Sequence, residues 1–329
     1  MAQQEGSSTV LIYKAEVTYN TVPHNDVDAM VLPFVSESVR LSRNLISSRT
    51  IRSSRNPLAP VRGNVDVAGD VTFELAHQYG KMLHLALGTY AAVSGESVGL
   101  AVGTYRHTFT IGTLPSFAIE KQFPDLDTAK YFQYTGCKVN SLKVSVKSEG
   151  MIECSASFMG ADETVANSTF AASAVDLGHQ PFDGFEAVIA EGGATLATAS
   201  TVDFTIENNL DGNSYVIDGT GKRHSIPVGT AKVSGTIAVL FENVTLYNKA
   251  IANDESSLIV VLTKGTGVGT AGNEKLTFTI GELIFQPNTP GISGPLGILV
   301  ELPFEAYYDN DAAASALKVV LDSTRPHYG

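Results

Sequence analysis

The chain repeats itself at a nearly constant spacing, and this repeat constrains its fold more than any other sequence feature. The pentapeptide TFTIG occurs at 108–112 and again at 277–281. VAGDVTFEL at 67–75 is similar to VSGTIAVLF at 233–241, and an Asn-Leu pair at 44–45 matches another at 209–210. The offset runs only from 165 residues (45 to 210) to 169 residues (108 to 277). Such a constant offset indicates an internal duplication.

Both copies contain a stretch that alternates between apolar and polar residues. In GNVDVAGDVTFEL, at 63–75, apolar side chains occupy odd positions, and polar residues such as Asp66, Asp70 and Glu74 occupy even positions. Alternation over thirteen residues predicts one half-buried strand, longer than the usual ~5–6 residues. The second copy keeps the phase, with Lys232 and Ser234 on its polar side.

A short helical pattern follows each of these strands. In the first copy Tyr79, Met82 and Ala86 recur at helical spacing, and Gly88 is a plausible stop. In the second copy FENVTLYNKAI, at 241–251, places Phe241 and Ile251 on one stripe. We expect both stripes to pack on a sheet.

Further alternating segments, bounded by Gly, Pro, Asn or Asp, complete each copy. The chain is therefore expected to be mainly β, with two tandem β-sandwich or barrel units that each carry a flanking α-helix. The expected organisation is a first unit with an N-terminal arm and an Arg-rich loop at 1–160, a connector at 161–195, and a second unit with a C-terminal tail at 196–329.

Composition and charge exclude several classes of protein. The net charge is -12, and an acidic chain is a poor candidate for gripping nucleic acid, because phosphates are neutralised by Lys and Arg. No apolar run reaches the ~18 residues that a membrane span needs. The start MAQQEGSSTV lacks the basic and apolar regions of a secretory signal. We expect a protein made in the cytoplasm of its producing cell.

No pattern indicates catalysis, a cofactor or a metal, so we predict neither an enzyme nor a metalloprotein. Cys137 and Cys154 fit no metal or redox spacing, and Cys154 lies on the apolar side of an alternating segment. The glycine-rich segment at 265–272 lies between two expected strands and indicates a hairpin tip. The pair Lys222-Arg223 fails as a phosphate-binding loop, because Arg223 stands where Ser or Thr must hold magnesium.

One segment concentrates positive charge in this acidic chain. It contains six of the 22 Lys and Arg residues: Arg40, Arg43, Arg49, Arg52, Arg55 and Arg62. One interpretation is a solvated loop beside a solvated sheet face. The other is that this segment contacts an acidic neighbouring subunit, since the guanidinium fork suits such pairs, while the acidic strand face lines a channel.

The sequence resembles tail tube proteins of long-tailed bacteriophages over nearly its whole length. YKAEVTYNTVP at 13–23 is similar to the YKxExTYGTxP start of many such proteins, with Asn20 in place of a common Gly. Segments at 69–88, 114–123, 136–160, 204–210 and 226–251 resemble the same family in the same order. Each segment is modestly specific, but their order strengthens the resemblance.

The resemblance implies a structural virion protein with a β-sandwich fold and a flanking helix. Family members form rings whose innermost strands join into one barrel around a lumen, and the rings stack through a long loop and the termini. A duplicated chain could close such a ring with three copies and pseudo-six-fold symmetry; a homohexamer is the alternative. The lumen-facing residues would be Asp66, Asp70, Thr72, Glu74, Lys232, Ser234 and Thr236.

The same resemblance implies a set of partners. These are further copies of the chain, a tape-measure protein in the lumen, and tail terminator and baseplate or distal tail proteins. DNA would pass without specific binding, and no membrane is involved. Two alternatives remain open: a baseplate or terminator ring of the same fold, and a non-catalytic β-sandwich module for binding or decoration. The absence of Trp argues against a sugar-binding module that stacks aromatic side chains on its ligand.

Overall fold

The computed structural model describes residues 3–24, 27–292, 297–308 and 314–329. Within them the chain is mainly β, as the sequence predicts. The strands of the first half are β1 (Val10–Ala15), β2 (Met30–Val31), β3 (Ser36–Glu37), β4 (Arg40–Ile46), β5 (Val61–Glu74), β6 (Gly88–Ser94), β7 (Tyr105–Ile111), β8 (Phe117–Phe123), β9 (Lys130–Lys147), β10 (Glu153–Gly160) and β11 (Asp162–Ala166). Those of the second half are β12 (Ala187–Glu191), β13 (Ala194–Thr195), β14 (Ala199–Glu207), β15 (Lys232–Leu240), β16 (Glu255–Thr263), β17 (Lys275–Phe285), β18 (Leu299–Tyr307) and β19 (Lys318–Ser323).

The helices are few and short. The α-helices are α1 (Gly80–Leu87) and α2 (Thr245–Ala252), and the 3-10 turns are η1 (Gly6–Ser8), η2 (His77–Tyr79), η3 (Gly95–Val98) and η4 (Gly184–Glu186). No helix among the described residues has the length and apolar character that crossing a membrane requires.

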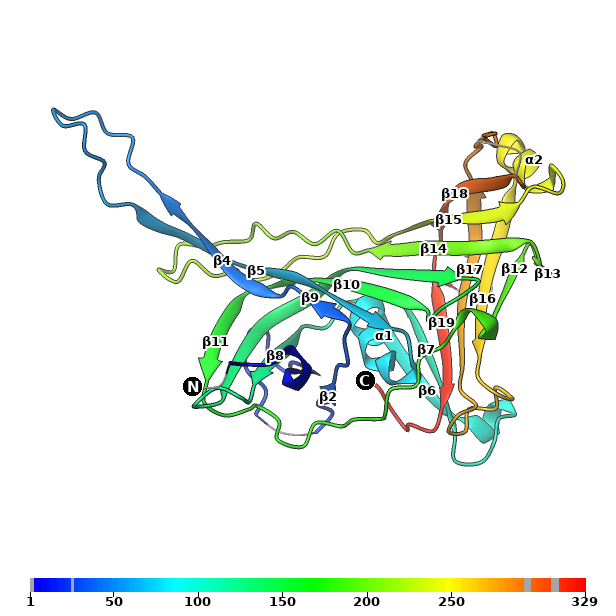
Figure 1. The fold of residues 1–329 in the computed structure, drawn as a ribbon, viewed down its shortest axis with the longest axis horizontal. Helices are drawn as coiled ribbons and strands as arrows, with labels where there is room; N and C mark the ends of the chain where they lie inside the picture. The colour runs from blue at the N-terminus through cyan, green and yellow to red at the C-terminus, as the bar shows by residue number, and fades with distance from the viewer. Residues whose placement is uncertain (1–2, 25–26, 293–296, 309–313) are drawn as a thin grey trace.

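One antiparallel sheet runs through both halves of the chain, and we call it the spanning sheet. Its strand order is β4-β5-β10-β9-β14-β15-β18-β17, and β3 extends the line of β4 by also pairing with β5. The central ladder, β9 to β14, joins the two halves. Figure 1 shows β14, β10, β9 and β5 side by side across the molecule, with α1 beneath them.

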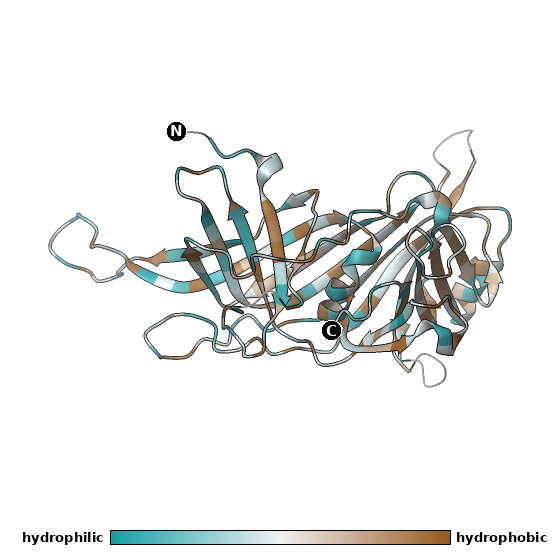
Figure 2. Cartoon of the chain, turned by 90° about the horizontal axis from the view of Figure 1, so that it is seen from below, coloured by the Kyte–Doolittle hydropathy of each residue, from teal (hydrophilic) through white to brown (hydrophobic). Residues whose placement is uncertain are grey.

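Each half adds a flanking sheet through one long shared strand. The first part of β9 pairs with β8 and β11, and β8 pairs with β1, which pairs with β2. β16 pairs along nearly the whole of β17, the first part of β17 also pairs with β19, and β16 pairs with β12. The core lies between the spanning sheet and these flanking sheets, where alternate strand residues are buried. Figure 2 shows the alternation of hydrophilic and hydrophobic residues along the strands.

The long strand and the first helix have the structure that the sequence predicts. β5 covers fourteen residues and buries Val65, Val67, Val71 and Phe73. The helix α1 is buried almost throughout and ends at Gly88, whose φ of 96° suits glycine and whose N–H donates to the carbonyl of His84. Helical spacing and the following glycine were therefore sufficient to predict α1 and its end.

The second helix packs against the core, but through Leu246 and Ala250 and not through the predicted stripe of Phe241 and Ile251. α2 does form, and Asn253 ends it with a left-handed φ of 57°. However, Val244 is 49% exposed and Ile251 is 59% exposed, whereas Ala250 is the buried residue of the helix. Figure 1 shows α2 at the end of the molecule farthest from the β4–β5 hairpin. Its apolar stripe therefore faces outward in a single chain.

The two TFTIG segments flank a single strand. Thr108 on β7 and Thr277 on β17 are both opposite Val320 of β19, each in an antiparallel ladder. The β6–β7 hairpin of the first half thus extends the flanking sheet of the second half. This ladder supplies a second connection between the halves, beside the one between β9 and β14.

Two glycines occupy matching places in the spanning sheet. Gly69 of β5 lies opposite Phe158 of β10, and Gly235 of β15 lies opposite Phe304 of β18. A Cβ at Gly69 would lie 2.4 Å from the Val39 Cα, and one at Gly235 would lie 2.6 Å from the Phe304 ring. Both glycines therefore allow a close approach that a side chain would prevent.

We expect Gly235→Ala to lower the free energy of unfolding by about 1–3 kcal/mol, the usual cost of overpacking a filled core. The added methyl would also lie 2.3 Å from the carbonyl oxygen of Asp203. Urea denaturation followed by circular dichroism measures the change. Gly6→Ala is the control, because nothing lies within 4 Å of its added Cβ. Equal stability of both variants would contradict the packing described here.

Candidate functional site

The outward face of the spanning sheet carries three rows of polar residues that cross five or six strands. The registers place these rows side by side. The first row is Asp70, Ser157, Ser141, Glu207 and Lys232. The second is Thr72, Ser155, Lys143, Thr205, Ser234 and Glu305, and the third is Glu74, Glu153, Ser145, Asp203, Thr236 and Pro303. We call these rows the polar face.

Six of the seven residues predicted to face a lumen belong to the polar face. They are Asp70, Thr72, Glu74, Lys232, Ser234 and Thr236. The seventh, Asp66, lies on the same side of β5 by alternation, two steps beyond the first row, with Ala68 between them. β5 and β15 are far apart in the sequence, and the three intervening strands, β10, β9 and β14, bring them into one sheet.

The chemistry of the polar face is that of a hydrated, weakly acidic surface. Its rows hold six carboxylates, two lysines and eight hydroxyl groups, and every residue is exposed or half-buried. Lys232 Nζ lies 3.5 Å from Glu305 Oε2, so one of the two ammonium groups is already paired. Glu74 pairs with His179 at 3.2 Å. Such a face repels a passing polyanion rather than binding it.

Asp66 differs from the other predicted residues because it is paired with an arginine from the second half of the chain. Arg223 lies in the loop 208–231 between β14 and β15, and its guanidinium is almost fully buried. It donates to Asp66 Oδ1 and to the carbonyls of Gly160 and Gly212, both at 2.7 Å. This contact fastens the β14–β15 loop onto β5 and β10.

Neighbouring side chains reinforce the same attachment. The Tyr215 hydroxyl donates to the carbonyl of Val65 at 2.9 Å, and burial raises its pKa. Lys138 Nζ donates to the carbonyl of Ile226 at 2.9 Å, and burial lowers its pKa. In the sequence, Arg223 stands out only as a mismatch to a phosphate-binding loop. Its structural role has no local signal, because the partner Asp66 is 157 residues away.

We expect Arg223→Ala to lower the free energy of unfolding by about 2–4 kcal/mol, since it leaves buried carbonyls without a donor. Arg223→Lys should recover only part of this loss, because one ammonium cannot reproduce the planar fork. Thermal unfolding measures both effects. Arg55→Ala is the matched control: Arg55 is exposed in the β4–β5 hairpin, and surface changes usually stay within about 0.5 kcal/mol. Equal effects of Arg223→Ala and Arg55→Ala would contradict the role given to Arg223.

The six arginines predicted to make contacts between subunits lie along the β4–β5 hairpin, a long arm that projects from the body in Figure 1. Arg40 and Arg43 lie on β4, Arg62 lies on β5, and the other three lie on the connecting loop. Among the described residues none of the six forms an ion pair. The arm also exposes apolar side chains: Leu45, Ile46, Ile51, Leu58 and Val61.

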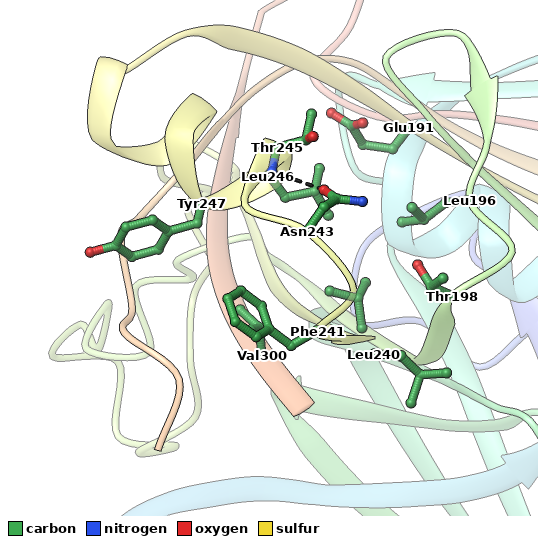
Figure 3. Close-up of a pocket in the computed structure, with 11 residues that line it drawn as sticks. Glu191, Leu196, Thr198, Leu240, Phe241, Asn243, Thr245, Leu246, Tyr247 and Val300 are labelled. Atoms are coloured by element: carbon green, nitrogen blue, oxygen red, sulfur yellow. Dashed lines mark hydrogen bonds between the residues drawn. The ribbon is translucent and has the colours of Figure 1, made fainter. Parts of the chain in front are cut away.

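A groove of about 190 Å³ lies beside α2. Figure 3 shows its lining, which comes from α2 and the loop before it, from the approach to β14, and from β12, β15 and β18. The lining is largely aliphatic and aromatic, and Asn243 Oδ1 accepts a hydrogen bond from the N–H of Thr245 at 2.9 Å. Glu191, the ionisable residue at one end, is paired with Lys249 at 2.6 Å. The groove shows no nucleophile beside a base.

Metal-ligating side chains and thiols give no second candidate site among the described residues. Within the described residues, no three His, Cys, Asp or Glu side chains gather where they could hold a metal ion. Cys137 and Cys154 are both buried and free, and burial raises the pKa of each thiol. Core packing, the role predicted for Cys154, agrees with this burial.

Comparison with known proteins identifies the family that the fold and the polar face fit. A family model described as phage tail tube protein matches residues 6–306, nearly the whole chain. A search of curated proteins finds no match.

Proposed function

The chain belongs to the phage tail tube protein family, and from that premise we propose that three copies form one ring of a tail tube. Stacked rings of this kind would provide the conduit for genome delivery into the host. As a member of the family, the protein is a structural component of the virion. The observation that carries the proposal is the spanning sheet, which ends on both sides in edges that further copies can extend.

The two halves pair their strands in the same way, which supports a duplicated unit. Every ladder within one set of elements in the first half has its counterpart within a set in the second half. The first set is β1, β4, β5, α1, β8, β9, β10 and β11. Its counterparts, in the same order, are β12, β14, β15, α2, β16, β17, β18 and β19. The Gly69–Phe158 and Gly235–Phe304 pairs occupy equivalent places. In this matching β6 and β7 are an insertion, so the two TFTIG segments are not equivalent.

The matching also refines the proposed units. β11 pairs with β9, and β12 pairs with β16. We therefore assign 10–166 to the first unit, 187–323 to the second, and 167–186 to the connector between them. Two equivalent units in one chain allow three chains to give the six-fold repeat that single-unit family members reach with six.

Strand counting supports three copies. Eight strands of the spanning sheet in each of three chains make a barrel of 24 strands. With strands about 4.8 Å apart and tilted by about 45°, such a barrel measures roughly 50 Å between opposite backbones. A DNA duplex fits within it after side chains are added. Six copies would double the circumference.

The polar face is the surface that we assign to the lumen. Its six carboxylates outnumber its two lysines, so DNA and a tape-measure protein could slide past without being held. Asp66 would stand at the margin of the bore, with its charge partly offset by Arg223.

The arginine-bearing arm is the element that we assign to contacts with a neighbouring ring. It projects from the body (Figure 1), and it exposes both guanidinium groups and apolar side chains. Tail terminator and baseplate proteins would meet the same surfaces at the two ends of the tube. A terminator or baseplate ring of the same fold is the alternative, and it would form single rings instead of tubes.

The proposal is tested by light scattering and negative-stain microscopy of the purified protein. We expect a ring mass near three times 34.8 kDa, with a central hole, and tubes at high concentration. The double variant Arg49→Glu/Arg52→Glu should keep the ring mass and lose the tubes, because it reverses charge only on the arm. A chain that stays monomeric when concentrated contradicts the proposal, and a six-chain ring contradicts its three-copy form.

A further inference from the structure

The ladder between β9 and β14 shows how a first unit and a second unit join inside one chain. Val144 lies opposite Phe204, and this register continues along both strands. The N–H of Asn208 donates to the carbonyl of Asn140 at 2.7 Å, and that of Ser148 donates to Ser200 at 3.2 Å. The even-numbered residues of β9 and β14 therefore form the hydrogen-bonded pairs of this ladder, and their backbone N–H and C=O groups point across the junction.

The edge formed by β3 and β4 is the counterpart of the β14 edge. Because Gly69 matches Gly235, Ala68 matches Ser234. Arg40 lies opposite Ala68 and Thr205 lies opposite Ser234, so Arg40 matches Thr205 and Val39 matches Phe204. The N–H of Ser38 donates to the carbonyl of Asp70 at 2.9 Å, inside the sheet. Because backbone groups alternate in direction, those of Glu37, Val39 and Leu41 point outward from the sheet. Among the described residues no strand lies on that side.

The segment that follows β17 forms the other edge. The N–H of Gln286 donates to the carbonyl of Pro303 at 2.7 Å, and the Asn288 side chain donates to that of Glu301 at 2.8 Å. These two bonds carry the segment along β18 as far as residue 288, and alternation turns the backbone groups of Pro287 and Thr289 outward.

Residues of β9 can be matched with this segment through the register. Ser141 lies opposite Ser157, and Gln286 continues the β17–β18 ladder opposite Pro303, so Ser141 matches Gln286. The bulge in β9 just before Ser141 has no counterpart in β17. Counting on from this pair, Lys143 matches Asn288 and Val144 matches Thr289.

Given the ring proposed above, on which this inference rests, we propose that the β3–β4 edge of one copy pairs with residues 286–292 of the next copy. The pairing has the register that β9 and β14 use. Val39 then lies opposite Thr289, and Arg40 lies opposite Asn288. Leu41 lies opposite Pro287, which has no N–H, so that pair forms one hydrogen bond instead of two. The partner is therefore a second copy of this chain, and the contact is an antiparallel ladder.

An ion pair occupies this edge in the single chain. Glu37 Oε2 accepts from the N–H of Val39 at 3.0 Å, and Lys121 Nζ donates to the carbonyl of Val39 at 2.9 Å. Lys121 and Glu37 are 2.7 Å apart and mostly buried. They satisfy both backbone groups that would bond Thr289, so they guard the edge until a copy in the correct register displaces them. Charged side chains and proline are common protections of an exposed edge.

Disulfide trapping tests the register. Arg40→Cys with Asn288→Cys should give disulfide-linked trimers after mild oxidation of assembled rings, because directly opposite residues of a non-hydrogen-bonded pair have Cα atoms close enough for a disulfide. Arg40→Cys with Gln286→Cys, or with Pro290→Cys, should crosslink weakly, since diagonal neighbours are about 7–8 Å apart. Ser42→Cys with Gln286→Cys restores an in-register pair. The native Cys137 and Cys154 are buried.

The outcomes separate this inference from the proposed function. Rings that form under reducing conditions, yet crosslink equally well off register or not at all, would overturn the register and leave the ring intact. Wild-type protein that forms no rings would instead contradict the proposed function.

The role of the Glu37–Lys121 ion pair at this edge can be tested separately. Glu37→Leu/Lys121→Met should shorten the half-time of ring assembly several-fold, measured by light scattering, because neither side chain then covers the backbone groups of Val39. Lys222→Met is the control, since it removes a different ion pair, that between Lys222 and Asp162. Assembly that is unchanged or slower than in wild type would show that the ion pair does not guard the edge.

Discussion

Backbone hydrogen bonding across the spanning sheet is the constraint on which the rest of the structure depends. A sheet of eight strands with two open ends leaves rows of unpaired N–H and C=O groups that must be paired, covered or protected. One junction, between β9 and β14, is satisfied inside the chain. The opposite edges are covered by an ion pair and interrupted by proline. On our account, ring formation completes the same ladder between copies.

Side-chain chemistry follows from this arrangement. Alternation sends apolar residues to one face, where they pack against the flanking sheets, and polar residues to the other face. The same rule keeps one face hydrated over both halves of the chain, because the β9–β14 register preserves the phase. Gly235 leaves room for the Phe304 ring, and Gly69 leaves room for the close approach of Val39. The proposed bore and the observed core are thus two faces of one sheet.

Local patterns predicted much of this fold. Period-two alternation located β5, and helical spacing with a following glycine located α1. The sequence could not predict how Arg223 reaches Asp66, because that contact depends on the path of a loop from the other half. It also misjudged α2: an apolar stripe shows that a surface is to be buried, but not whether its partner lies in the same chain. The two TFTIG segments lie on β7 and β17, which both pair with β19, and in the matching that we propose these strands are not equivalent.

The most direct test of the ring is a cryo-electron microscopy cross-section of the assembled tube, at a resolution that separates strands. We expect three chains around the bore and 24 strands in an unbroken antiparallel barrel, eight from each chain. The polar face should line the bore. A ring of six chains, a barrel with gaps between copies, or a bore lined by other strands would contradict this arrangement.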